Sequence, residues 1–316
     1  MQQKNTYGIA FYNLENLFDT VDDPHLLDDN FTPKGFNKWK DKRYRRKLKK
    51  LAYAISKIGE YDMVAPPILL GIAEVENSNV VRKLITQDAL KNEPYDFVHF
   101  DSPDERGIDT GLIYNTRHFK VLSSETMPLL ITNGFGKRDY TRDILYVHGE
   151  LNGEEVHIFV NHWPSRRDGA SATEYKRVKA AKLILQKIET IQESPESLNC
   201  IIMGDFNDDP NSASIKYLMQ SGLFINPMQK LLSPYSGSAK YKGKWNLFDQ
   251  ILISHSFLNL EKGTHTFEKA RIFAPDFLKE WKGKYKGSPF RTFAGKKYLG
   301  GYSDHFPVYL ILKYFE

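Results

Sequence analysis

The chain has 316 residues, of which 41% are hydrophobic and 26% are charged; these values exclude a peptide hormone, a disulfide mini-protein and a largely disordered chain. The formal net charge of +5 at pH 7 permits a polyanionic or phosphorylated partner without requiring one. Cys200 is the one cysteine of the sequence, which excludes an intramolecular disulfide and a cysteine-based zinc site.

No stretch of the sequence approaches the roughly 18 apolar residues that a transmembrane helix needs. The first residues lack the apolar core of a signal peptide, so we expect a soluble protein with no targeting signal in this chain. Export after removal of a signal peptide stays open, and the sequence leaves the compartment unknown. No repeat or linker divides the chain, so we expect one domain over residues 1–316. Nothing in the sequence indicates an obligate protein partner.

Short apolar runs that stop at clusters of polar residues predict strands along most of the chain. In chain order they cover residues 7–12, 68–73, 97–100, 111–114, 144–151, 156–161, 200–203, 249–253 and 307–312. Apolar residues with helical spacing predict a helix over residues 41–59 and another over residues 173–192. Shorter helices are expected after Asn77 and Asn211. Many strands and few, well-separated helices favour packed sheets with helices outside.

Several predicted strands end abruptly in acids, amides or histidines, which puts polar side chains at a sheet edge where they can line a cleft. These residues are Asn13, Glu74, Asn161, His162, Asp205, Asn207, Asp249, Asp304 and His305. Taken singly, most have an ordinary explanation, such as a turn at Asp205 or a core histidine at His162. Glu74 is harder to explain, because it follows an apolar run and an unpaired charge near the interior costs several kcal/mol.

As a set, these residue types indicate hydrolysis of a phosphate ester. Carboxylate and amide oxygens without cysteine suit a hard cation such as Mg²⁺ or Mn²⁺. Histidines next to acids then fit proton transfer better than metal binding. Hydrolysis needs a group that orients and deprotonates water, a cation that spreads the phosphoryl charge, and hydrogen bonds to the phosphate oxygens. Each of these roles has a candidate in the sequence.

Two motifs carry a resemblance to a known family. Gly-Asp-Phe-Asn at residues 204–207 and Ser-Asp-His at residues 303–305, in this order and in these strand contexts, resemble the endonuclease/exonuclease/phosphatase superfamily of DNase I-like proteins. The resemblance extends from Asn13 to His305. It implies a four-layer αββα sandwich, in which two mostly antiparallel sheets pack face to face with helices outside.

The resemblance also implies a divalent metal ion, bound by Asn13, Glu74 and Asp304. Ala73 precedes Glu74, where the family usually has glutamine, so any helper role of that glutamine is vacant here. Glu15 occupies a position that some members use as a second acid.

For catalysis, the resemblance implies that Asp205 positions or deprotonates the attacking water and that Asn207 holds a phosphate oxygen. His162 corresponds to a histidine near the phosphate. His305 corresponds to a general base or to a cation that stabilises the phosphate, and Asp249 to the acid that orients it.

The segment after Arg106 resembles the part of the family that places a further acid and an aromatic residue near the phosphate. This implies that Asp109 orients His162 and that Tyr114 binds the phosphate.

Further polar and basic residues bear on the substrate. Asn161 and Arg166 are candidates for phosphate contacts. Residues 38–50 carry nine basic residues and one acid, which fits the solvated face of the predicted helix better than a nucleic-acid surface. Residues 279–298 interleave basic and aromatic residues, which suits either a loop that shapes the substrate site or a packed loop with solvated lysines. Residues 241–245 repeat this pattern on a smaller scale.

The sequence therefore predicts a phosphoester hydrolase that depends on Mg²⁺ or Mn²⁺ and attacks its substrate with water. A nuclease is the first interpretation, with nucleic acid as the partner. The alternative is a phosphatase or phosphodiesterase for a phospholipid, an inositol phosphate or another small ester. A binding module that kept the fold and lost the chemistry is a third interpretation, which the complete set of polar residues disfavours.

Overall fold

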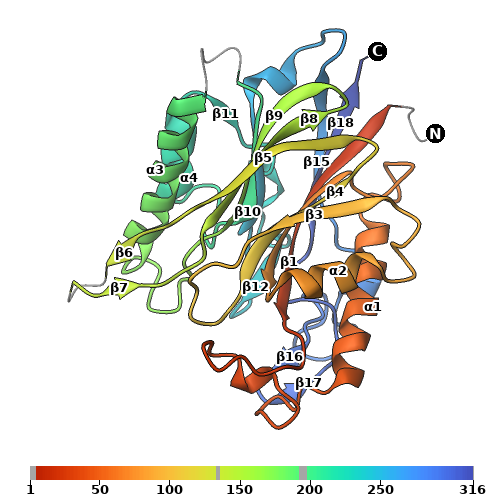
Figure 1. The fold of residues 1–316 in the computed structure, drawn as a ribbon, viewed down its shortest axis with the longest axis vertical. Helices are drawn as coiled ribbons and strands as arrows, with labels where there is room; N and C mark the ends of the chain where they lie inside the picture. Colours follow the sequence, from red (N-terminus) through yellow and green to blue (C-terminus); the bar gives the residue numbers. More distant parts are fainter. Residues whose placement is uncertain (1–4, 133–135, 192–197, 316) are drawn as a thin grey trace.

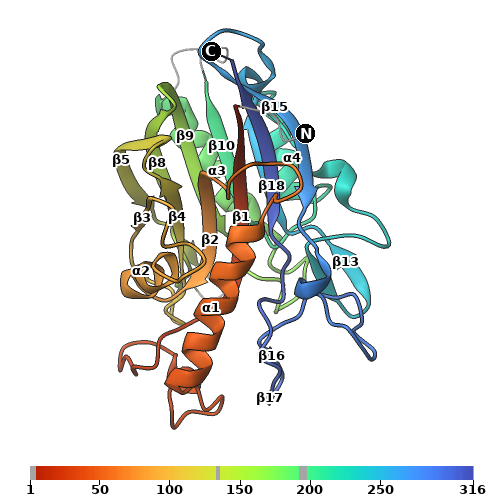
Figure 2. The ribbon, with the colours of Figure 1, turned by 90° about the vertical axis from the view of Figure 1, so that its right-hand side faces the viewer.

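Two six-stranded sheets form the centre of the computed structural model, which describes residues 5–132, 136–191 and 198–315 (Figure 1). The first sheet has the order β15 (His265–Ile272), β18 (Val308–Tyr314), β1 (Thr6–Leu17), β2 (Leu69–Val75), β4 (Asp109–Asn115) and β3 (Tyr95–His99), which Figure 2 shows side by side. The second has the order β11 (Phe224–Ile225), β14 (Asp249–Ser254), β10 (Cys200–Asp205), β9 (Glu154–His162), β8 (Ile144–Leu151) and β5 (Phe119–Met127).

Within these sheets, β1 pairs with β2 and β9 pairs with β10 in parallel, and the other pairings of the described strands are antiparallel. The carboxyl ends of two parallel neighbours lie at the same edge of a sheet. Asn13 therefore lies opposite Ala73, and His162 lies opposite Asp205. This topology gathers the polar strand ends predicted from the sequence.

Apolar side chains from the two facing sheets fill the space between them. Phe11 and Leu112 of the first sheet share one buried cluster with Val147, Ile158 and Met203 of the second. Since successive side chains of a strand point to opposite faces, the alternate residues of each strand face outward and need a further layer.

Helices supply that further layer on both sides. The helices α1 (Asp41–Lys57) and α2 (Ser78–Ile85) pack on the first sheet, and α3 (Glu174–Ile191) and α4 (Ala213–Gln220) pack on the second, on opposite sides of the molecule in Figure 1. Asn77 caps α2 by accepting a hydrogen bond from the amide of Val80 at 3.0 Å. The architecture is the expected four-layer αββα sandwich.

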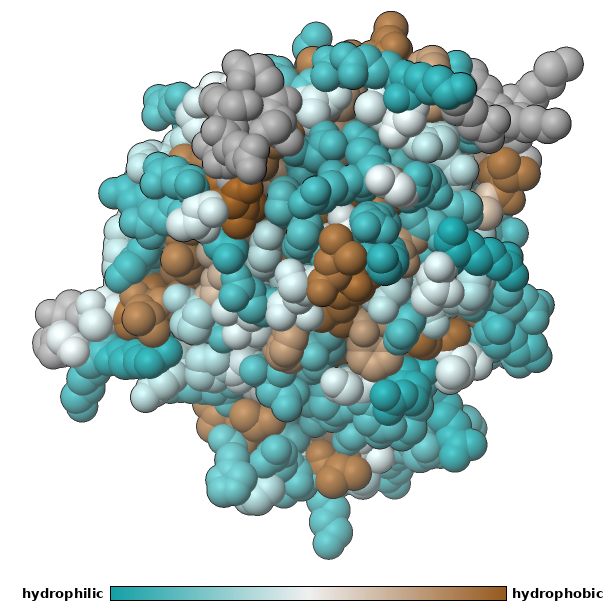
Figure 3. Space-filling model, turned by 45° about the horizontal axis from the view of Figure 1, so that its top comes forward, coloured by the Kyte–Doolittle hydropathy of each residue, from teal (hydrophilic) through white to brown (hydrophobic). Residues whose placement is uncertain are grey.

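Several smaller elements complete the described chain. They are the strands β6 (Ile131–Thr132), β7 (Arg138–Asp139), β12 (Ala239–Tyr241), β13 (Lys244–Asn246), β16 (Phe293–Ala294) and β17 (Lys297–Tyr298), and the 3₁₀ helices η1 (Asp29–Phe31), η3 (Gln229–Leu231), η4 (His255–Leu258) and η5 (Asp276–Leu278). Within the part of the chain that the structure describes, no helix has the length and apolarity that a membrane crossing requires. On the face in Figure 3, hydrophobic residues form small separate groups in a mostly hydrophilic surface.

The sequence predicted each of the four helices and the longer central strands close to their observed bounds, although residue 192 of the second predicted helix lies outside the described residues. It missed the short strands β6, β7, β11, β12, β13, β16 and β17, and two longer ones, β5 and β15. Each of these two lies at an edge of its sheet and exposes much of its length, as in the run Lys120–Ser124 of β5. An edge strand needs no continuous apolar run, so the hydrophobic pattern carries no signal there.

Candidate active site

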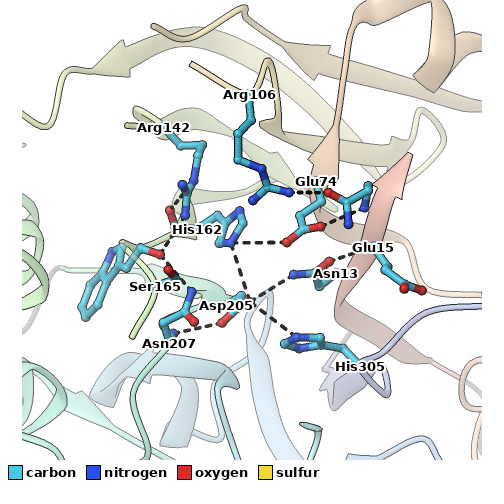
Figure 4. Close-up of polar contacts among 12 residues, drawn as sticks. Asn13, Glu15, Glu74, Arg106, Arg142, His162, Ser165, Asp205, Asn207 and His305 are labelled. Atoms are coloured by element: carbon cyan, nitrogen blue, oxygen red, sulfur yellow. Dashed lines mark hydrogen bonds and ion pairs between the residues drawn. The ribbon is translucent and has the colours of Figure 1, made fainter. Parts of the chain in front are cut away.

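The polar strand ends converge on one large cleft, about 1030 Å³ in volume. Its walls include Glu74 from β2, His162 from β9, Asp205 from β10, and His305 just before β18. In Figure 4 these side chains, together with Asn13 of β1, point toward one another.

Local backbone irregularities aim these side chains into the cleft. The pairing of β1 with β2 shifts between Asn13 and Leu17, and Glu15 and Asn16 have φ angles of 50° and 51°. Glu74 itself has φ 61°, and Asn207 has φ 49°. Left-handed backbone in residues other than glycine costs free energy and concentrates at functional sites. The strands therefore bulge at the points where their polar residues face the cleft.

Asn13 connects the two sheets at the floor of the cleft. Its amide nitrogen donates to Asp205 Oδ2 at 3.0 Å, and its oxygen accepts a hydrogen bond from the amide of Glu15 at 2.9 Å. Asn13 is 1% exposed, so this arrangement is fixed. The side chain predicted as a metal ligand thus holds Asp205 in place through its nitrogen.

Glu74 presents a carboxylate to the cleft from the neighbouring strand. Its Oε2 accepts a hydrogen bond from the amide of Asn16 at 2.8 Å, and its Oε1 lies 3.8 Å from His162 Nε2. Only 14% of the side chain is exposed. Oε1 thus belongs to a mostly buried carboxylate at the wall of the cleft, and a carboxylate oxygen is a preferred ligand of a hard divalent cation.

Asp205 lies between the two histidines of the cleft. Its Oδ2 is 3.8 Å from His162 Nε2 and 3.9 Å from His305 Nε2. The amide of Asn207 donates to Asp205 Oδ1 at 2.9 Å, and the Asn207 side chain donates to the carbonyl of Trp163 at 2.9 Å. Both Asp205 oxygens are therefore oriented by fixed donors.

The expected pairing of His305 with Asp249 is present. His305 Nδ1 lies 2.6 Å from Asp249 Oδ2, and Asp249 is fully buried. With Nδ1 held by the carboxylate, the other ring nitrogen, Nε2, faces Asp205 and the cleft.

Burial and neighbouring charges set the protonation of these groups. Burial raises the pKa of Asp205 to about 6, although His305 opposes the shift. Burial disfavours charge on His305, but Asp249 and Asp205 outweigh it and hold the pKa of His305 well above its usual range. Burial and the nearby Arg142 and Arg106 hold the pKa of His162 well below its usual range. At neutral pH the site thus contains a charged His305 and a neutral His162.

Arginines that sequence reasoning did not assign complete this side of the cleft. Arg142 donates to the carbonyls of His162 and Trp163, at 3.3 and 2.9 Å, and pairs with Asp104 at 3.0 Å. Arg106 donates to Asn16 Oδ1. Arg106 begins the segment whose resemblance suggested roles for Asp109 and Tyr114, but no role was assigned to it. No motif marks Arg142, which meets its partners only when the strand ends converge.

Asp304 belongs to a second polar network at the cleft. It pairs with Arg291, and burial, which would raise the pKa of Asp304, is outweighed by His305 and Arg291, so that this pKa is lowered. Glu15 is buried next to this pair and accepts a hydrogen bond from the amide of Thr292 at 2.6 Å. Burial and the nearby Asp304 raise the pKa of Glu15 to about 7.

Two residues predicted near the phosphate lie elsewhere. Tyr114 is opposite Leu69 at the far end of β2, and its hydroxyl is 3.4 Å from Asp96. Asp109 is at the correct end of β4, but its carboxylate accepts hydrogen bonds from Ser102 rather than from His162. Among the described residues, His162 Nδ1 is buried without a hydrogen-bond partner. The order of residues along β4 could not reveal these orientations.

Asn161 and Arg166 also differ from the prediction. Asn161 is fully buried, where it donates to the carbonyl of Met203 at 3.1 Å and accepts from the Trp163 indole at 2.9 Å, so it fixes the interior. Arg166 lines the cleft but is engaged, since it pairs with Asp208 at 2.7 Å.

The basic segments have different roles from one another. In the 279–298 segment, Phe293 packs against Trp39, and Lys50 of α1 lies over Phe290. These two phenylalanines therefore pack on the side of the molecule where α1 covers the first sheet. Of that segment, only Arg291 lines the cleft, whereas Lys240 and Tyr241 of the β12–β13 hairpin both do. The smaller basic-aromatic segment therefore forms the wall of the site.

The comparisons with known proteins agree with this fold. No curated protein matches the sequence significantly. Among solved structures, an endonuclease/exonuclease/phosphatase family protein from Bacteroides thetaiotaomicron is 17% identical with a TM-score of 0.61, and the match covers 99% of both chains. A humanized D. rerio TDP2 is 18% identical with a TM-score of 0.60, covering 98% of this chain and 100% of that one. A mannosyl-6-phosphatase of Bacteroides thetaiotaomicron is 16% identical with a TM-score of 0.59, with the same coverage.

The family model described as "Endonuclease/Exonuclease/phosphatase family" matches residues 8–314, which is nearly the whole chain. With the αββα sandwich and the cleft at its strand ends, this match shows that the chain belongs to the endonuclease/exonuclease/phosphatase family.

Proposed function

We propose that this chain is a divalent-metal-dependent hydrolase that cleaves phosphodiester bonds of nucleic acid by attack of water. The family consists of phosphoester hydrolases, which gives the reaction class. The observation that carries the proposal is the convergence of Glu74, His162, Asp205 and His305 on one cleft, with Asp205 between the two histidines.

The oxygen donors at the cleft fit a hard divalent cation. Glu74 directs Oε1 toward a cleft that Asp205 and Asp304 also line, and carboxylate oxygens are the ligands that a hard divalent cation prefers. Glu74 and Asp304 would hold Mg²⁺ or Mn²⁺, with the Asn13 oxygen as the remaining candidate. Such a cation, when bound, supplies charge neutralisation at the phosphoryl oxygens.

Asp205 is the proposed acceptor of the water proton. Its pKa of about 6 lies close to neutral pH, where a general base combines the correct protonation state with sufficient basicity. The amides of Asn13 and Asn207 fix its two oxygens, so the carboxylate needs no reorientation before it accepts the proton.

His305 is the proposed cation that stabilises the phosphate. The Asp249 carboxylate holds Nδ1 and favours the protonated ring, which leaves an N–H on Nε2 facing the cleft. The raised pKa argues for this role and against a general base, because a base must be unprotonated when it accepts a proton. The neutral His162 is available as a further hydrogen-bonding group.

The walls of the cleft support nucleic acid as the substrate. Tyr140 and Tyr241 line it and are 46% and 67% exposed, which suits stacking on bases. Arg106, Arg167 and Lys240 line it as well, and none of the three forms an ion pair with a carboxylate of the described residues. D. rerio TDP2, which shares the fold, has been solved with a single-strand DNA product.

A small phosphate ester is the second candidate. Four other basic residues of the cleft pair with acids, which reduces the positive charge available to a polyanion; they are Arg142, Arg166, Lys176 and Arg291. A protein with the same fold is a mannosyl-6-phosphatase. A small ester needs only the residues at the centre of the cleft and few contacts with the basic residues of its walls.

Hydrolysis assays with Mg²⁺, Mn²⁺ or EDTA test the proposal on plasmid DNA, single-stranded RNA, bis-p-nitrophenyl phosphate, inositol phosphates and a sugar phosphate. The His305→Ala variant serves as control for a contaminating nuclease. Metal-dependent cleavage of DNA or RNA by the wild type alone supports the nuclease. Turnover of small esters alone replaces it with the second candidate, and no turnover of any substrate contradicts both.

A further inference from the structure

A group of side chains on the outer face of the second sheet has no part in the proposed reaction. His148 of β8 and His157 of β9 are directly opposite each other in the antiparallel pairing, and Glu155 is two residues from His157 on the same face. His157 precedes His162 by five residues, which is about 17 Å along the strand. This group is therefore separate from the cleft.

The three side chains are already drawn together. The imidazole rings of His148 and His157 stack with their centroids 4.8 Å apart and their planes at 16°. His148 Nε2 lies 2.7 Å from Glu155 Oε1. One ligand atom from each of the three residues lies within 4.8 Å of the other two. Donors around a bound divalent ion lie about 3–4 Å apart, so small rotations suffice to close the site.

A neighbouring residue fixes the orientation of one ring. The Tyr146 hydroxyl is 2.9 Å from His157 Nδ1, which leaves Nε2 as the ring nitrogen for a ligand. Metal-binding histidines commonly have their second nitrogen held in this way by a polar group. Glu155 is 66% exposed and His148 is 23% exposed, so both can turn toward an ion that enters from solvent.

The surrounding charges are balanced. Lys187 of α3 pairs with Glu125 of β5 at 2.5 Å and lies over the ring of Tyr146, whose hydroxyl contacts His157. Glu150 is opposite Glu155 across the strands and pairs with Lys120 at 3.4 Å. Lys187 and Lys120 are thus each paired with a glutamate, which reduces the positive charge that a cation would meet at this group.

We propose that His148, Glu155 and His157 form a second metal site, which takes a borderline divalent transition metal such as Zn²⁺, Ni²⁺ or Cu²⁺. Two imidazoles and one carboxylate select these ions over Mg²⁺, for which the oxygen donors of the cleft are suited. The bound ion joins β8 to β9 and stabilises this side of the sheet, next to the edge strand β5. The site does not depend on the proposed hydrolase activity.

Calorimetric titration with Ni²⁺, in an excess of Mg²⁺ that occupies the cleft, tests this site. The proteins are the wild type, the His148→Gln/His157→Gln variant, and His255→Gln, which removes an exposed histidine of η4 as a matched control. His305→Gln measures any Ni²⁺ bound in the cleft. We expect the double variant to lose one equivalent of Ni²⁺ relative to the wild type and His255→Gln to lose none. Equal stoichiometry and affinity in the wild type and the double variant would overturn the proposal.

Glu155→Gln provides a test that does not threaten folding, because this side chain is largely exposed. We expect Ni²⁺ to bind about tenfold or more weakly. Ni²⁺ should also raise the melting temperature of the wild type more than that of this variant, and hydrolysis in Mg²⁺ should be unchanged. An unaltered Ni²⁺ affinity in Glu155→Gln would contradict its role as a ligand.

Discussion

Lys47 shows how a single buried charge can organise the edge of the cleft. The residue lies in α1, and its side chain is 1% exposed. Its ammonium group donates to the carbonyl of Glu15 and to Thr292 Oγ1, each at 2.5 Å, and lies 3.8 Å from the Glu15 carboxylate. A buried cation is tolerated only when partners satisfy it in this way. Lys47 thereby joins α1, β1 and the 279–298 segment.

Replacement of Lys47 with methionine should lower the free energy of unfolding by about 3–5 kcal/mol, because it removes the buried cation 3.8 Å from the Glu15 carboxylate and the donor to the Glu15 carbonyl and Thr292. Urea denaturation at pH 7 measures the loss. Lys49→Met removes an exposed lysine of the same helix and should leave the stability nearly unchanged. Equal stability of the two variants would show that the buried pair contributes nothing.

The sequence identified some functional residues more readily than others. Asp205, Asp249 and His305 stand in recognisable motifs at strand ends, and the structure brings them together. Lys47 was hidden among nine basic residues, yet it lies on the apolar stripe of α1, one residue before the buried Leu48. That position was an available signal. Arg142 offered none, because its carbonyl partners, His162 and Trp163, lie about twenty residues further along the chain, at the end of β9 and just after it.

At the scale of elements, Gly204 explains part of the Gly-Asp-Phe-Asn motif. A Cβ atom at this position would be 2.4 Å from the carbonyl oxygen of Asn161, which is backbone of the neighbouring strand β9. The strands β9 and β10 can therefore place His162 beside Asp205 only if residue 204 lacks a side chain.

Gly204→Ala should destabilise the protein by about 2 kcal/mol or more and should reduce activity, because β10 must move away from β9. Thermal unfolding and hydrolysis rates measure both effects. Gly71→Ala is the matched comparison, since its nearest neighbour is the flexible side chain of Met203 at 2.5 Å, and it should be milder. A Gly204→Ala protein as stable and active as Gly71→Ala would refute the close-packing argument.

Asp62 ties two strands of the first sheet to the segment after α1. It accepts hydrogen bonds from the Tyr309 hydroxyl at 2.6 Å, from Lys269 at 2.9 Å and from Arg271 at 2.9 Å. Burial alone would raise the pKa of Asp62, but these three partners outweigh it and hold the pKa below 3.8. The ionised form is thus stabilised by folding.

Asp62→Asn should cost about 2 kcal/mol of stability at pH 7, because three donors lose a charged acceptor. A folded-state pKa below the unfolded value gives stability that is present above pH 3.8 and is lost as the pH falls through the folded-state pKa. The difference in melting temperature between wild type and variant should therefore shrink below about pH 4. Asp88→Asn, at an exposed pair with Lys91, should change little. A difference that stayed constant down to pH 3 would rule out this linkage.

Elements with a strong periodic pattern could be predicted, and the others could not. The apolar spacing of Tyr44, Leu48 and Leu51 gave α1, because these residues must face the sheet. No comparable pattern exists in β15, where most residues stay partly exposed and the pairing with β18 shifts between Phe267 and Lys269. An edge strand such as β15 pairs with one neighbour only and can leave little trace in its own sequence.

At the scale of the whole molecule, the cleft is assembled from separate parts of the chain. The sequence drew attention to residues 279–298, but Phe290 and Phe293 pack inward from that segment. The walls instead include Tyr140 and the β12–β13 hairpin, which pairs with His305 through Ala239. Composition could not decide which basic-aromatic segment lines the cleft, because packing determines that.

The hairpin should therefore control substrate recognition. The Lys240→Ala/Tyr241→Ala variant should raise KM for plasmid DNA about tenfold, through lost charge and stacking, while kcat/KM for bis-p-nitrophenyl phosphate stays unchanged. Lys244→Ala removes an exposed charge of the same hairpin outside the cleft and should have little effect. If the variant lost kcat/KM equally on both substrates, these two residues would support the fold rather than bind the substrate.

The catalytic role of Asp205 is the central claim, and the hydrolysis rate of Asp205→Asn tests it most directly. The measurement uses the best substrate of the panel in saturating Mg²⁺, with circular dichroism to confirm the fold. The account predicts that kcat falls by a factor of about 10²–10⁴, because asparagine cannot accept the proton of the attacking water. A folded Asp205→Asn protein that hydrolyses the substrate at the wild-type rate would contradict the proposed active site.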